Sequence, residues 1–79
     1  MQSIKKDIYD GISRIHDKRF RKLLGEFNYE KDSNKRAKIA KKSLSELEKI
    51  RKYDIGRYRM IELFWHYEIG LMRLVCGQP

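Results

Sequence analysis

Apolar residues recur at helical spacing along the chain, most regularly in its N-terminal third. There they are separated by three or four positions in most cases, and comprise Ile4, Ile8, Ile12, Ile15, Leu23, Leu24 and Phe27. Such spacing places side chains on one face of an α-helix. It predicts a first helix over about residues 3–27, with Ser3 as a candidate N-cap.

A polar segment over residues 28–34 interrupts this stripe, and helical spacing then resumes. Read as a single helix, residues 34–76 would be about 64 Å long, against about 37 Å for the first helix. In a monomer, half of so long a helix would have nothing to pack against. We therefore expect either a break or a second copy that covers the excess length.

The segment Tyr53-Asp54-Ile55-Gly56 is the candidate for that break, since Asp54 can cap a following helix. It predicts helices over about residues 34–53 and 55–76, the last ending before Gly77. The fold class is then all-α, a small three-helix bundle in one domain over residues 1–79. The alternative is a long helical hairpin completed by dimerisation.

Positive charge gathers in the middle of the chain. The sequence has 19 Lys and Arg against 11 Asp and Glu, a net charge of +8. Residues 35–59 carry +7 of it, from ten basic and three acidic groups. On a helical wheel most of these basic residues fall in one arc of roughly 160°, whereas Arg36 and Arg51 lie in the apolar half. The arc comprises Lys35, Lys38, Lys41, Lys42, Lys49, Lys52, Arg57 and Arg59.

This arc is typical of a surface that binds a phosphate backbone, where each neutralised phosphate releases counterions. It would equally serve docking on an acidic protein surface, and similar charge runs also occur on helices that only face solvent. We do not expect membrane insertion, because the opposite side offers Ala and Leu rather than the Trp and Phe of interfacial helices. The first functional hypothesis is a small basic protein associated with nucleic acid.

The C-terminal segment Met60–Cys76 is apolar at twelve of its seventeen positions. Either it is the central helix of the bundle, or it buries one face inside and the other against a partner. Interface cores are rich in aromatic residues and Met, so we expect self-association, most simply a homodimer, or a protein partner. The predicted interface residues are Phe64, Trp65, Tyr67, Leu71 and Met72. The second functional hypothesis is a regulator or inhibitor of the compact kind encoded by phages and mobile elements, acting through this helix.

Groups for catalysis or metal binding are few. Glu62 and His66 lie four residues apart, but a metal site needs three or four ligands. The spacing of Arg59 and His66 resembles the Arg-x(4–6)-His motif of helical HEPN ribonucleases, which act as dimers. The resemblance covers those two positions only. Met60 stands after the arginine, where that family customarily has a polar residue. We therefore predict binding without catalysis, and no metal or cofactor.

A single cysteine, Cys76, excludes an internal disulfide framework. The N-terminal lysines are not followed by an apolar segment of the kind a secretory signal needs. Both features favour a cytoplasmic location.

Overall fold

Three α-helices joined by short turns form the described part of the chain. The computed structural model describes residues 2–77, and their side chains from residue 5 onward. Helix α1 spans Gln2–Tyr29, α2 spans Ser33–Tyr53 and α3 spans Ile55–Val75. These bounds agree with the predicted ones to within two residues at each end. The all-α three-helix bundle is thereby confirmed.

Local backbone features set the ends of the helices. Asp54 adopts a non-helical conformation (φ −153°, ψ 85°), which ends α2, and its Oδ1 accepts a 3.0 Å hydrogen bond from the N–H of Arg57 at the start of α3. Gly77 has φ +69°, the left-handed conformation that follows many helix C-termini. The predicted break and cap are both present. The alternative of one continuous helix over residues 34–76 is wrong.

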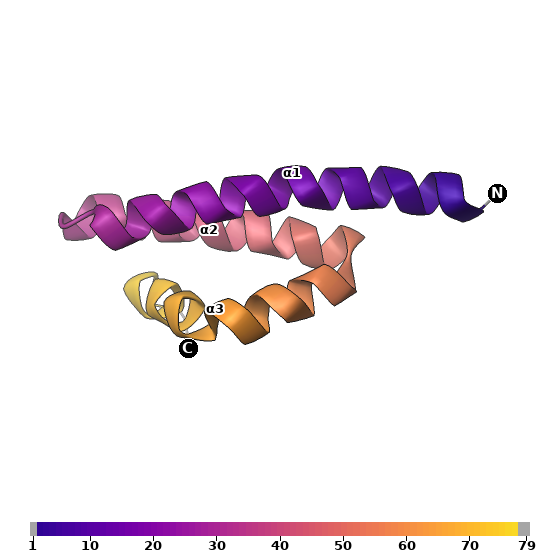
Figure 1. Cartoon of the computed structure of the whole chain (residues 1–79). Coiled ribbons are helices and arrows are strands. Elements are labelled where there is room, and N and C mark those ends of the chain that lie inside the picture. Colours follow the sequence, from indigo (N-terminus) through magenta and orange to yellow (C-terminus); the bar gives the residue numbers. More distant parts are fainter. Residues whose placement is uncertain (1, 78–79) are drawn as a thin grey trace.

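Helix α2 lies between the other two, and both run antiparallel to it (Figure 1). It packs extensively against α1 and α3, whereas α1 and α3 touch each other little. The suggestion that the C-terminal helix is central is therefore wrong. Ala40 and Ser43 of α2 are completely buried, and such small residues allow close approach to two neighbours at once.

The core takes residues from all three helices, and its position on α1 differs from the prediction. The buried apolar residues are Phe20, Leu24, Phe27, Ala40, Leu47, Ile50, Ile61, Ile69 and Met72. On α1 they continue a stripe begun by two buried polar residues, Ser13 and Asp17. This stripe turns Ile8 and Ile15, which are 56% and 54% exposed, away from α2. The side chain of Ile4 lies outside the described residues.

Helix α3 bends at Trp65, whose φ of −117° and ψ of 19° are not helical. Its last turns consequently leave the line of the preceding ones (Figure 1). The described residues extend over 48 × 20 × 17 Å, and their radius of gyration of 13.4 Å exceeds the roughly 12 Å of a compact domain of this length. None of the helices over residues 2–77 is both long and apolar enough to cross a membrane.

Candidate nucleic-acid interface

Six lysines occupy the solvent-exposed side of α2. We call this the lysine face: Lys35, Lys38, Lys41, Lys42, Lys49 and Lys52. All six are exposed, because the opposite side of α2 supplies Ala40, Leu47 and Ile50 to the core. Among the described residues none of the six forms an ion pair. Their charges are therefore not paired with carboxylates, and only that of Lys52 lies near an aromatic ring, with its Nζ 5.6 Å from the ring centre of Tyr53.

The other two residues of the predicted arc do not belong to this face. The wheel assumed one helix over residues 35–59, but the break at Asp54 places Arg57 and Arg59 on α3. Arg57 turns inward toward α1, and only Arg59 is exposed. The helical wheel placed these two residues on the wrong face, because it assumed one straight helix and the chain changes direction at Asp54.

Arg57 joins the corner between α2 and α3 to the middle of α1. Its guanidinium nitrogens lie 3.1 Å from Asp10 Oδ1, 3.1 Å from Asp17 Oδ2 and 3.5 Å from Asp54 Oδ2. Ser13 Oγ donates a 3.4 Å hydrogen bond to Asp54 Oδ2. Burial of Arg57 lowers its pKa, but the hydrogen bonds and charges of Asp10 and Asp17 outweigh that effect and raise it above the ordinary value. Arg57 is thus a fixed structural cation.

Most of the carboxylates near α2 are engaged by groups outside the lysine face. Glu46 of α2 pairs with His16 of α1, each side chain 14% exposed. Arg21 and Arg57 hold Asp17, which is buried. Glu48 is the exception: it lies 3.6 Å from Arg51, is 71% exposed and lines a surface hollow with Lys49 and Lys52. The lysine face accordingly carries six positive charges with the single carboxylate of Glu48 at its edge.

The two arginines in the apolar half of the wheel lie over aromatic rings. The guanidinium carbon of Arg36 lies 4.2 Å from the ring centre of Phe27, and that of Arg51 lies 5.6 Å from that of Tyr58. At these distances the ring quadrupole attracts the cation. Both arginines act in packing between helices and add nothing to the lysine face.

The predicted interface on the C-terminal helix is only partly accessible. Phe64 and Tyr67 are exposed by 69% and 67%, whereas Trp65 and Leu71 are half-buried and pack against the core. Met72 is completely buried within the chain, so its prediction as an interface residue is wrong. Three further exposed apolar residues were missed. Together they define the outer face of α3: Met60, Leu63, Phe64, Tyr67 and Leu74.

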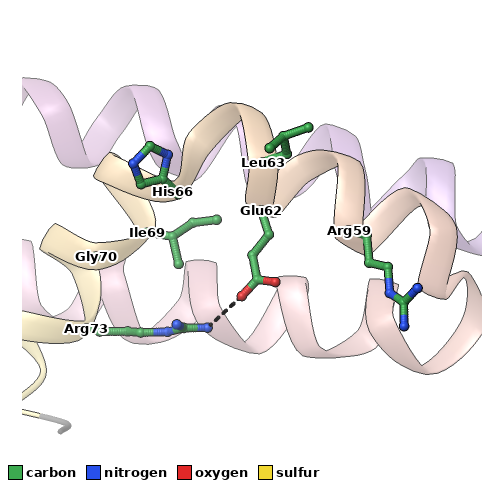
Figure 2. A pocket seen from close by; sticks show the side chains of 7 residues that line it. All are labelled: Arg59, Glu62, Leu63, His66, Ile69, Gly70 and Arg73. Carbon is green, nitrogen blue, oxygen red and sulfur yellow. Dashed lines mark hydrogen bonds and ion pairs between the residues drawn. The ribbon is translucent and has the colours of Figure 1, made fainter.

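A shallow groove follows the flank of α3 beside its bend (Figure 2). Its lining comprises Arg59, Glu62, Leu63, His66, Ile69, Gly70 and Arg73. Arg73 lies 3.5 Å from Glu62 across the bend, and Glu62 also accepts a 3.0 Å hydrogen bond from the hydroxyl of Tyr58. Burial and this bond to Glu62 raise the pKa of Tyr58. Arg59 and His66, whose spacing prompted the comparison with HEPN ribonucleases, both line the groove.

No three His, Cys, Asp or Glu side chains come together as metal ligands within residues 2–77. A comparison with family models, curated proteins and solved structures found no match to this chain. Its function must therefore be argued from its own surfaces.

Proposed function

We propose that this protein binds double-stranded nucleic acid through the lysine face of α2, by contacts to the phosphate backbone and without catalysis. The observation that supports this most is the set of six exposed lysines with no ion-pair partner among the described residues. A helix of 21 residues is about 32 Å long. That length suits several successive phosphates along one groove edge.

The side chains on this face favour backbone contact over base recognition. Lysine presents a compact point charge, whereas the planar guanidinium of Arg is better suited to bidentate contact with guanine. Single-stranded nucleic acid is commonly held by aromatic side chains that stack on bases. The exposed residues of α2 include no aromatic side chain, since Tyr53 is half-buried and its ring lies 5.6 Å from that of Tyr9. Duplex binding with little sequence preference follows.

Titration of a labelled duplex at about 50 and about 200 mM salt tests the proposal. If six phosphates are contacted, the affinity should fall by roughly a thousandfold over this range. A triple variant, Lys38→Glu, Lys42→Glu and Lys49→Glu, should abolish binding. The matched control, Lys6→Glu, Lys18→Glu and Lys22→Glu, makes the same charge change at exposed positions of α1 and should retain most of the affinity.

Equal loss of affinity in both triple variants would indicate an unspecific effect of net charge and contradict the assignment to α2. Absence of duplex binding at 50 mM salt would overturn the proposal. An acidic protein surface would then be the remaining partner for these lysines. Tighter binding to a single strand than to a duplex would contradict the argument from the missing aromatic residues.

A further inference from the structure

We propose that the outer face of α3 binds a second copy of this chain. This inference does not depend on the proposed function, because no lysine of the lysine face lies on α3. It rests on the area of the outer face and on its charge balance.

The outer face is as large as the largest apolar patches that monomers normally expose. Its five apolar side chains are 60–74% exposed. Taking about 200 Å² for a large side chain, they present on the order of 600 Å² of apolar surface, at the upper end for a single patch on a monomer. Two such faces in contact would remove roughly 1,200 Å² from water. A specific interface needs about 1,000 Å² or more.

Charge also favours a second copy at this face. From Arg59 onward, α3 carries two acidic and two basic residues, Glu62 and Glu68 against Arg59 and Arg73. The chain as a whole carries +8, so two copies repel each other when their lysine faces approach. The outer face of α3 allows contact where the charges balance, and leaves the lysine face of each copy free.

Sedimentation of the purified full chain tests the inference first. The wild type should sediment as a dimer of twice 9.6 kDa at micromolar concentration. The double variant Leu63→Glu and Tyr67→Glu should weaken the dimer by at least about thirtyfold, since both residues are central to the face. Far-UV circular dichroism should remain unchanged, because both side chains are mostly exposed in the single chain. The control Ile15→Glu, at an exposed isoleucine of α1, should remain dimeric.

A monomeric wild type at several hundred micromolar would overturn the inference and leave the outer face to a different protein. If Ile15→Glu dissociated the dimer and the double variant Leu63→Glu and Tyr67→Glu did not, the dimer contact would lie on α1. That result would also overturn the inference.

Discussion

At the scale of single residues, the most consequential side chain is Arg57, which three carboxylates from two elements surround. It is 27% exposed, and Asp17 beside it is only 10% exposed. Removing one partner of such a cluster leaves the remaining charges without compensation in a partly buried place. The single residue Arg57 thus fixes how the corner between α2 and α3 meets α1.

The substitution Arg57→Met should lower the free energy of unfolding by about 2–3 kcal/mol, because Asp10, Asp17 and Asp54 would then repel one another. Arg14→Met is the matched control. Arg14 pairs with Asp10 at 3.0 Å but is 70% exposed, so its loss should cost less than about 1 kcal/mol. Urea unfolding of both variants measures the difference. Equal effects would show that the cluster is no more than a surface feature.

At the scale of elements, α1 is a 28-residue helix with two glycines in its interior, Gly11 and Gly25. Its N-terminal turns extend past the corner between α2 and α3 (Figure 1), so part of the helix has little to pack against. Packing normally supplies most of the stability of a helix. The stability of this end must therefore depend more on the intrinsic helix preference of its residues.

The substitution Gly11→Ala should raise the free energy of unfolding by up to about 1 kcal/mol, since alanine has the highest helix propensity. A Cβ at this position would meet no atom within 4 Å, so no steric cost opposes the gain. Gly25→Ala should act in the same direction for the same reason. Thermal unfolding followed by circular dichroism measures both. A lower melting temperature for Gly11→Ala would mean that the glycine has a contact outside the single chain.

At the scale of the whole molecule, charge and apolar surface are separated. The lysine face lies on α2 and the exposed apolar residues of the outer face lie on α3. Both proposed contacts can therefore form at once. Binding of the lysine face to a duplex is driven by attraction between opposite charges, whereas the dimer forms against the repulsion of two chains of charge +8. Salt should therefore weaken duplex binding and strengthen the dimer.

Raising the salt concentration from about 50 to about 500 mM should tighten the proposed dimer by several-fold, since screening weakens the repulsion and leaves apolar burial intact. The same change should weaken duplex binding by orders of magnitude. Sedimentation and a fluorescence titration on the same samples would measure the two effects. A dimer that dissociates as salt rises would indicate that ion pairs hold it, contrary to the proposed apolar contact.

The sequence by itself determined the elements and the lysine face. Helix bounds follow from spacings of three and four residues and from caps such as Asp54 and Gly77, all of which act within a few positions of the chain. The six lysines of α2 share one side for the same local reason. No knowledge of neighbouring helices was needed for these features, because the α-helix relates residues only to those within one or two turns.

Only the tertiary structure decided which helix is central, which side of α1 is buried and where Arg57 points. The isoleucine side of α1 is more apolar than the side that is buried in the structure. Ser13 and Asp17 nevertheless face inward, because Arg57, 40 residues after Asp17, supplies the ionic partner that buried Asp17 requires. Likewise, Met72 and Leu63 are both apolar residues of one helix, but α2 covers only one side of it, so Met72 is buried and Leu63 is exposed. Such outcomes depend on pairs of residues brought together across turns, and local spacing carries no information about those pairs.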